Sequence, residues 1–126
     1  MYITITNFNS HGPKPMKLNG IIKLEKEHEN LYDSEAISCE MRHFGKIGYV
    51  SNSVKTVAMG SMSAGRIYDK IGEEHYAKVK FIIDSIAIAK VLNEEEFKEE
   101  LKNPDSDIHY LCEDKSKVSF EDIKGD

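Results

Sequence analysis

The sequence predicts a small, mainly β protein: an OB-like or SH3-like barrel of six or seven strands with one short helix, followed by an acidic, helical C-terminal extension. Short segments rich in β-branched residues recur at close spacing, and turn residues such as Gly, Pro, Asn and Asp separate them. No helical segment between them is long enough for the crossover of a parallel βαβ unit. A bent antiparallel sheet or barrel is therefore the favoured architecture.

Each strand is predicted from alternating or continuous apolar residues bounded by turn signals. Asp84-Ser85 predicts a kink between the last two strands, and Ser51-Asn52-Ser53 predicts the cap of a short helix at 54–59. A flexible loop of small residues is expected at 60–65. The predicted strands lie at residues 2–8, 18–26, 36–41, 46–50, 66–71, 76–83 and 85–92.

Charge divides the chain into two predicted parts, a barrel at 1–92 and an acidic extension at 93–126. The first part has 12 Lys and Arg against 10 Asp and Glu, a balance of +2, whereas the second has 5 against 12, a balance of −7. Asn93 followed by Glu96 predicts a capping box and a helix that begins there. Apolar residues spaced along the extension indicate that it docks on the barrel instead of remaining wholly disordered.

Several classes of protein are disfavoured by the sequence. Cys39 and Cys112 are far apart, so they predict neither a metal knuckle nor a disulfide framework, and a reducing cytoplasm is the expected location. The histidines lack the spacing of zinc ligands, and no nucleophile or paired-carboxylate motif stands out. We therefore expect no cofactor, no membrane association and no enzymatic activity.

The most informative segment is a polar turn followed by two strands. Lys26-Glu27 ends one strand, Asn30-Leu31-Tyr32-Asp33 forms the turn, Ala36-Ile37 opens the next strand, and Gly48-Tyr49 lies on the strand after it. Polar turn residues and an aromatic ring grouped in this way are typical of a binding surface.

In these residues, and over about 18–88, the chain resembles the HIRAN domain, a small β-barrel found fused to fork-remodelling helicase-type ATPases and as a stand-alone bacterial protein. The resemblance implies a partly open barrel that grips the 3′ end of single-stranded DNA, in DNA repair or replication-fork processing. It implies that Tyr32 stacks on the terminal base, that Asn30 hydrogen-bonds the same nucleotide, and that Asp33 accepts a hydrogen bond from the free 3′-hydroxyl. Tyr49 and Lys46 would line the adjoining groove.

The sequence departs from the HIRAN pattern at the same place. His28 and Leu31 stand where proline is frequent, Glu35 replaces asparagine, and Ser51-Asn52 follow Tyr-Val where members that bind DNA ends carry a basic residue. The glutamates around Glu27 add negative charge near the expected pocket.

Cations and tyrosines alternate through the barrel part, as in proteins that bind single strands. Lys26, Lys46 and Arg66 are the candidate phosphate contacts, and Arg66 follows a glycine-rich loop that lacks a nucleotide-binding signature. Tyr68 and Tyr76 are expected to pack on the core with their hydroxyls outward, whereas stacking and packing are equally weighted for Tyr32.

A second hypothesis stays open. The barrel is then a protein-interaction or self-association module with no DNA-end binding, and the acidic extension binds a basic partner or covers the basic body.

Overall fold

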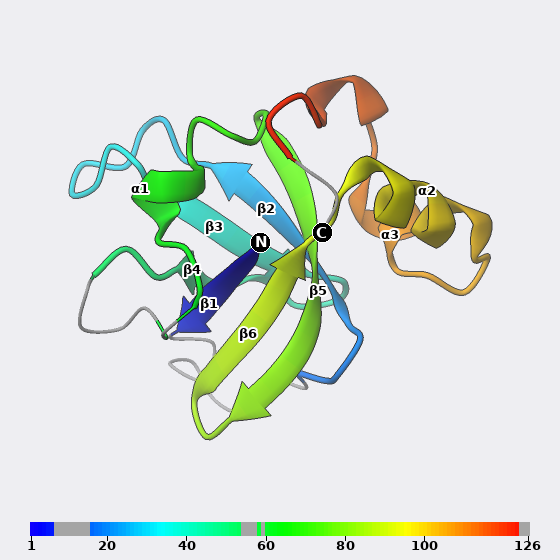
Figure 1. The fold of residues 1–126 in the computed structure, drawn as a ribbon, viewed down its shortest axis with the longest axis horizontal. Coiled ribbons are helices and arrows are strands. Elements are labelled where there is room, and N and C mark those ends of the chain that lie inside the picture. The colour runs from blue at the N-terminus through cyan, green and yellow to red at the C-terminus, as the bar shows by residue number, and fades with distance from the viewer. Residues whose placement is uncertain (7–15, 54–57, 59, 124–126) are drawn as a thin grey trace.

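The computed structural model describes residues 1–6, 16–53, 58 and 60–123. Six antiparallel strands close into a barrel in the order β1-β4-β3-β2-β5-β6 (Figure 1). The predicted mainly β barrel is confirmed. The strands are β1 (Tyr2–Thr6), β2 (Ile21–Lys26), β3 (Ile37–Met41), β4 (Gly45–Val50), β5 (Glu74–Ile83) and β6 (Ile86–Val91).

Alternate residues of most strands point into the barrel, as the period of two requires. Ile3 and Ile5 of β1, for example, are fully buried in this core, while Tyr2 and Thr6 at the two ends of the strand are partly exposed. Residues from all six strands share one core. Burial of these side chains supplies the main stabilising free energy of the barrel.

The long hairpin of β5 and β6 turns at the predicted kink. Asp84 has φ of 53°, a left-handed conformation that Asp tolerates better than most residues. Strand β2 is shorter than predicted, because Asn19 also has a positive φ of 66° and the extended chain begins only after Gly20.

The strand predicted at 66–71 is wrong. This segment begins with a short helix, α1 (Ala64–Ile67), and the Ser63 side chain caps it by accepting a hydrogen bond from the Arg66 backbone N–H at 3.3 Å. Ala64 and Ile67 are both fully buried. A single turn of helix brings these two apolar side chains into the barrel core, where a strand would have directed its apolar residues to alternate faces.

The described part of the loop at 60–65 is fixed on β1. The side-chain hydroxyls of Ser61 and Thr4 form a buried hydrogen bond with 2.7 Å between their oxygens. The Met62 backbone N–H donates to the Tyr2 carbonyl at 2.7 Å. The expected flexible loop is therefore an ordered one here. The helix predicted at 54–59 falls, apart from Ala58, outside the described residues.

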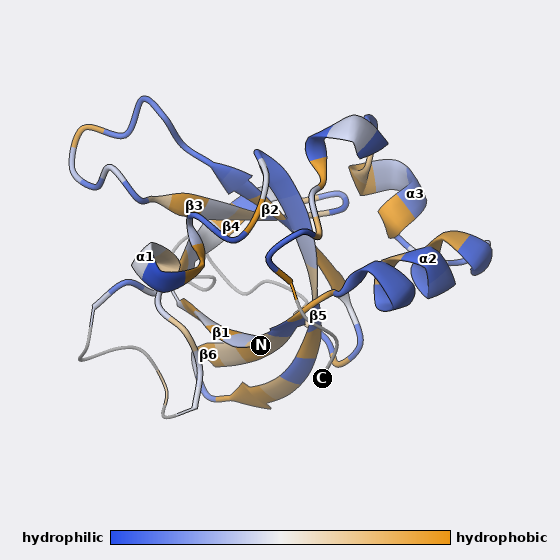
Figure 2. Ribbon diagram, turned by 45° about the horizontal axis from the view of Figure 1, so that its top comes forward, coloured by the Kyte–Doolittle hydropathy of each residue, from blue (hydrophilic) through white to orange (hydrophobic). Residues whose placement is uncertain are grey.

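The C-terminal extension forms α2 (Glu94–Lys102), α3 (Ile108–Leu111) and a 3-10 turn, η1 (Lys115–Lys117), beside the barrel. The predicted capping box is confirmed, because Asn93 and Glu96 exchange hydrogen bonds at 2.8 and 3.0 Å. Figure 2 shows α2 as a mainly hydrophilic helix with isolated apolar positions. Of these, Phe97 belongs to a second core and Leu101 packs against it. The buried residues of this second core are Ile21, Tyr76, Leu92, Phe97, Ile108 and Leu111.

Tyr76 joins the barrel to the extension. It packs in the core as expected, but its hydroxyl is buried and donates to the Leu111 carbonyl at 3.3 Å instead of pointing outward. Burial raises the pKa of this hydroxyl, since a phenolate could not be solvated there. Tyr68, by contrast, is only partly buried against the first core.

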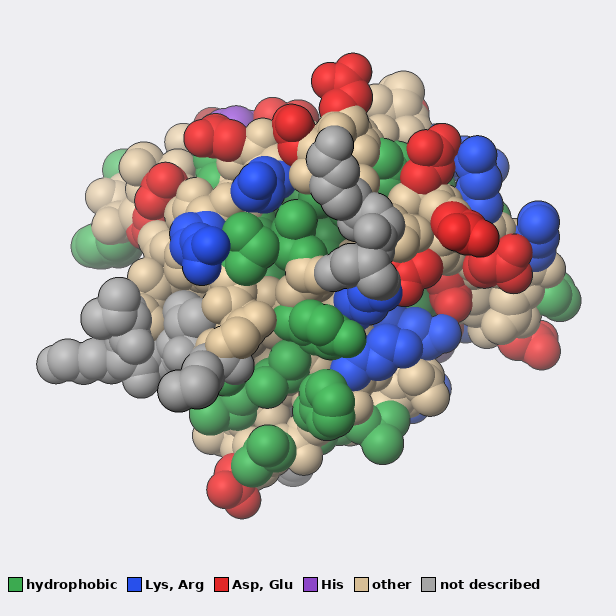
Figure 3. Space-filling view, in the orientation of Figure 1, with side chains coloured by type: hydrophobic (Ala, Val, Ile, Leu, Met, Phe, Trp, Pro, Cys, Tyr) green, Lys and Arg blue, Asp and Glu red, His purple; other side chains and the backbone are tan. Residues whose placement is uncertain are grey.

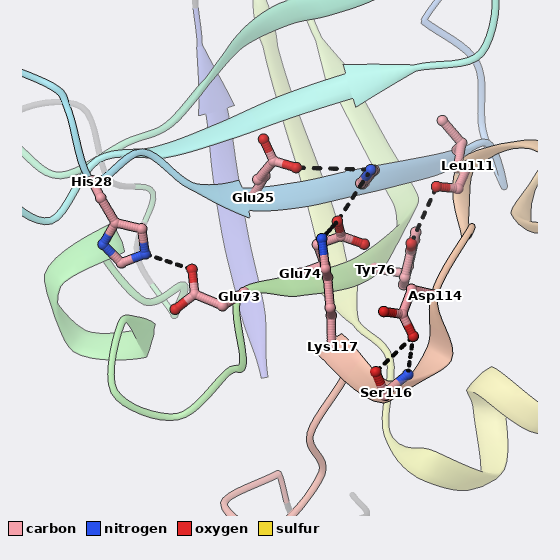
Figure 4. A network of polar contacts seen from close by, with 10 residues as sticks. Glu25, His28, Glu73, Glu74, Tyr76, Leu111, Asp114, Ser116 and Lys117 are labelled. Atoms are coloured by element: carbon pink, nitrogen blue, oxygen red, sulfur yellow. Dashed lines mark hydrogen bonds and ion pairs between the residues drawn. The ribbon is translucent and has the colours of Figure 1, made fainter.

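Ion pairs also hold the extension on the barrel. Lys78 and Lys90 of the barrel contact Glu100 and Glu96 of α2 at 3.0 and 2.9 Å. In Figure 4, Glu74 lies between the barrel and the extension, where it pairs with Lys23 and Lys117. The extension thus directs part of its negative charge toward the lysines of the barrel. None of the described helices has the length and apolar character needed to cross a bilayer.

Candidate functional site

A groove of about 490 Å³ lies where the ends of β1 and β4 meet the turn between β2 and β3. The register places Thr6 opposite Tyr49, so these two partly exposed side chains stand side by side in its lining. Four of the residues predicted for the binding site line this groove, although they come from two different segments. Its described lining is Thr6, Asn30, Tyr32, Asp33, Ala36, Tyr49, Val50, Ser51, Asn52 and Ser53.

In the turn that carries Tyr32, side-chain oxygens accept hydrogen bonds from the backbone N–H groups. The side-chain carbonyl oxygen (Oδ1) of Asn30 accepts hydrogen bonds from the backbone N–H groups of Tyr32 and Asp33, each at 2.9 Å. One Asp33 oxygen accepts another from the Glu35 N–H at 2.9 Å. Such Asx turns order a loop without proline. Tyr32 is therefore presented on an ordered turn with 98 % of its surface exposed.

The Asp33 carboxylate is oriented by a neighbour across the groove. Its second oxygen accepts a hydrogen bond from the side-chain amide nitrogen (Nδ2) of Asn52 at 3.2 Å. The side-chain oxygen (Oδ1) of Asn52 accepts one from the Gly65 backbone N–H at 2.8 Å. Gly65 leaves room for this close approach, since a Cβ there would lie only 3.1 Å from the same Asn52 oxygen. Asp33 still has lone pairs for a ligand, because a carboxylate accepts about four hydrogen bonds.

A second network, centred on Glu27, lies beside the groove and shares Asn30 and Tyr49 with its lining. The Glu27 carboxylate accepts hydrogen bonds from the Asn30 amide at 3.1 Å, the Lys46 ammonium at 2.8 Å and the Tyr49 hydroxyl at 3.0 Å. Lys46 also donates to the Tyr49 hydroxyl at 3.0 Å. We call these four residues the Glu27 cluster. Three of its members were candidate site residues, and the cluster fixes their positions relative to one another.

The Glu27 cluster is ionic at neutral pH. Burial alone would raise the pKa of Glu27, but the hydrogen bonds from Lys46, Asn30 and Tyr49 outweigh it, so the pKa lies below its usual 4.5. The hydrogen bond to Glu27 in turn raises the pKa of Lys46. The positive charge of Lys46 is thus already matched by a carboxylate.

The candidate cations lie outside the lining of the groove. Lys46 and Lys26 line a neighbouring depression that also contains Glu25, Glu27 and Glu29. Lys26 places its ammonium 4.5 Å from the centre of the Tyr68 ring. Arg66 is exposed on α1 and lines neither hollow.

Among the described residues of the lining, Asp33 is therefore the only one with a charged side chain. The other polar lining residues carry hydroxyl or amide groups, and the tyrosines add aromatic rings. Such a surface suits an uncharged ligand group that donates hydrogen bonds and offers a flat face for stacking. A phosphate placed beside Asp33 would be repelled.

Sequence reasoning did not assign roles to Asn52 and Glu27. Asn52 belongs to the Ser51-Asn52 pair noted as a departure from the HIRAN pattern, and only the tertiary structure reveals its contacts with Asp33 and Gly65. Glu27 belongs to the strand-ending pair of the motif, but its partners Lys46 and Tyr49 come from β4. His28, beside the turn, is exposed and pairs with Glu73. The described residues contain no group of side chains suited to hold a metal ion.

The chain is similar in fold to the crystal structure of the HIRAN domain of human HLTF. The two are 14 % identical, the TM-score is 0.47, and the match covers 79 % of this chain and 80 % of the other. This match names the domain that the sequence motif resembles. No protein-family profile matches the chain, and no curated protein sequence matches it.

Proposed function

We propose that this protein is a nucleic-acid-binding module that holds the unphosphorylated 3′ end of a single strand in the groove. One observation carries the proposal: an almost fully exposed tyrosine ring stands on an ordered turn next to an oriented carboxylate. An exposed aromatic face provides stacking, which contributes about 1–3 kcal/mol per base. The carboxylate accepts a hydrogen bond from the terminal hydroxyl.

Each groove residue then has a chemical role. Tyr32 stacks on the terminal base, and Asp33 accepts the hydrogen bond from the 3′-hydroxyl. Asn30 donates one amide hydrogen to Glu27 and keeps the other for the nucleotide. Tyr49 presents its ring to the groove while Glu27 holds its hydroxyl.

This chemistry also defines what the groove rejects. A 3′-phosphate would bring about two negative charges close to Asp33, with no described cation in the lining to compensate. Discrimination between a free and a phosphorylated end therefore depends on Asp33. Because few phosphates are neutralised, we expect affinity to depend weakly on salt.

The direct test is fluorescence anisotropy with a short labelled strand ending in a free 3′-hydroxyl, compared with the same strand ending in a 3′-phosphate and with a blunt duplex. We expect the free hydroxyl to bind best and Asp33→Asn to remove most of the preference. The asparagine can still bond the Glu35 N–H, so this variant should fold. Equal binding of all three probes, or an undiminished preference in Asp33→Asn, contradicts the proposal.

The biological setting that fits this activity is DNA repair or replication-fork processing in the cytoplasm, where free 3′ ends arise. Under this proposal the module recognises the end and does not catalyse a reaction on it.

A protein contact is the second candidate function, and the outer face of the β5–β6 hairpin supports it. Phe81 pairs with Ile88 and Ile83 with Ile86, and Phe81 and Ile83 are 55 % and 61 % exposed. Figure 3 shows hydrophobic side chains gathered over this hairpin beside a group of lysines. Exposed apolar patches commonly mark protein interfaces.

Light scattering over a concentration series tests self-association through this hairpin. If it occurs, the mass should rise with concentration in the wild type and less in a Phe81→Lys/Ile83→Lys variant. A constant monomer mass in both proteins excludes self-association as the role of the patch.

A further inference from the structure

We propose that Glu27 is a specificity-determining positioning residue that keeps Lys46 from binding the phosphate backbone of a strand in the groove. The inference rests on the proposed function and extends it, because it assigns the selection of a 3′ end without a terminal phosphate to a second carboxylate besides Asp33. Nothing in the sequence motif places Lys46 and Glu27 in contact.

The geometry of the Glu27 cluster carries this inference. Lys46 donates to both Glu27 and Tyr49, and Tyr49 donates to Glu27, so the three groups form a closed triangle with edges of 2.8, 3.0 and 3.0 Å. The Glu27 side chain is 22 % exposed and that of Lys46 is 53 % exposed. The carboxylate is thus the more buried of the two groups, and both line the depression beside the groove.

A phosphate that enters this depression meets a lysine that is already paired. To bind the phosphate, Lys46 must weaken its charge-assisted hydrogen bond with Glu27, and the phosphate must approach the Glu27 carboxylate. A strand that presents a free 3′-hydroxyl here instead of a phosphate imposes neither cost. Glu27 therefore lowers the affinity for charged backbone in this depression while it holds Asn30 and Tyr49 in place for the end that lacks a 3′-phosphate.

Glu27→Gln separates this role from a purely structural one by the sign of its effect. Glutamine keeps the size and one acceptor oxygen but removes the charge, which frees Lys46. We expect tighter binding at low salt and a salt dependence steeper by about 0.7 in the slope of log K against log salt, the value for one additional phosphate contact on a single strand. The preference for a 3′-hydroxyl over a 3′-phosphate should fall several-fold.

The matched control is the double variant Glu27→Gln/Lys46→Gln. Without the lysine, the salt slope should return to the wild-type value even though Glu27 is absent. A structural role alone predicts weaker binding with an unchanged slope in Glu27→Gln. That result, or a slope that stays steep in the double variant, overturns the proposal.

A measurement without nucleic acid tests the contact itself. Acetylation of lysines with a dilute acylating reagent, followed by mass spectrometry, should modify Lys46 several-fold faster in Glu27→Gln than in the wild type. Lys102, whose side chain is 75 % exposed on α2, serves as the internal reference. Unchanged reactivity of Lys46 overturns the proposal.

The two proposals fail in distinguishable ways. If the wild type binds the 3′-hydroxyl strand and needs Asp33, but Glu27→Gln leaves the slope unchanged, only the role of Glu27 is refuted. If the wild type binds no strand at all, the proposed function fails and this role with it, even where Lys46 reactivity rises.

Discussion

The amide of Asn52 joins the carboxylate of Asp33 to the first turn of α1. Asn52 donates to Asp33 at 3.2 Å and accepts from the Gly65 N–H at 2.8 Å, so one side chain connects the end of β4, the turn after β2 and the helix. The carboxylate that we assign to the terminal hydroxyl is therefore positioned by tertiary contacts and not by its own turn alone.

Replacing Asn52 should loosen this arrangement. In Asn52→Ala two hydrogen bonds are lost, and at about 0.5–1.5 kcal/mol each the free energy of unfolding should fall by roughly 1–3 kcal/mol. Binding of a 3′-hydroxyl strand should weaken several-fold because Asp33 is no longer oriented. Urea unfolding and anisotropy measure the two effects. Wild-type values in both would show that the contact has no energetic role.

Tyr32 should matter for binding and not for stability. Its ring is 98 % exposed, so Tyr32→Leu should change the free energy of unfolding by less than about 0.5 kcal/mol. Loss of stacking should cost about 1–3 kcal/mol of binding free energy, or roughly 5- to 150-fold in Kd. Tyr32→Phe is the control and should retain most of the affinity. Equal weakening by Phe and Leu would indicate a role for the hydroxyl instead of the ring.

Phe97 should show whether the extension and the barrel unfold together. It is 6 % exposed, and its ring centre lies 5.7 Å from that of Tyr76 and 5.4 Å from that of Phe120. Phe97→Ala should lower the free energy of unfolding by about 3–5 kcal/mol. Glu99→Ala, on the exposed side of α2, should change it by less than about 0.5 kcal/mol. One urea transition followed by both fluorescence and circular dichroism is expected, whereas two separate transitions would identify residues 93–126 as an independent unit.

His75 should make the protein less stable in mild acid. The side chain is fully buried, its Nε2–H donates to the Leu92 carbonyl at 2.8 Å, and Nδ1 has no partner among the described residues. Burial lowers the pKa of His75 below 6.5, and the bond to Leu92 offsets this only in part. Below pH 6.5 the unfolded chain therefore binds a proton that the folded chain does not, so stability falls with pH by up to about 1.4 kcal/mol per unit.

Urea unfolding at pH 7.5, 6.5 and 5.5 measures this effect. His75→Gln keeps an N–H donor for Leu92 but cannot titrate, so its stability should vary less between pH 6.5 and 5.5. The comparison concerns the slopes, because the substitution can lower the stability at every pH. The lowered pKa values of Glu27 and Glu100 act in a separate window, since their stabilisation is lost only as the pH falls below about 4.5. Parallel slopes in the two proteins would exclude His75 as the cause.

Much of the fold could be predicted from local pattern. Alternation of apolar residues located all six strands, and Asn93 with Glu96 located the start of α2, because strand faces and helix caps depend on residues close together in the chain. The segment at 66–71 could not be predicted in this way. Its four-residue helix depends on burial of Ala64 and Ile67 in the barrel core, which is a tertiary contact.

The sequence by itself determined the β-barrel class and the turn that carries Asn30, Tyr32 and Asp33, since periodicity and turn chemistry are local properties. The tertiary structure decided which charges remain available. Closure of the barrel brings Lys46 of β4 against Glu27, which directly follows β2. The packing of α1 against this region places Asn52 between Gly65 and Asp33. Electrostatic pairing depends on distance in space, and residues 13 to 19 positions apart acquire that distance only when the chain folds.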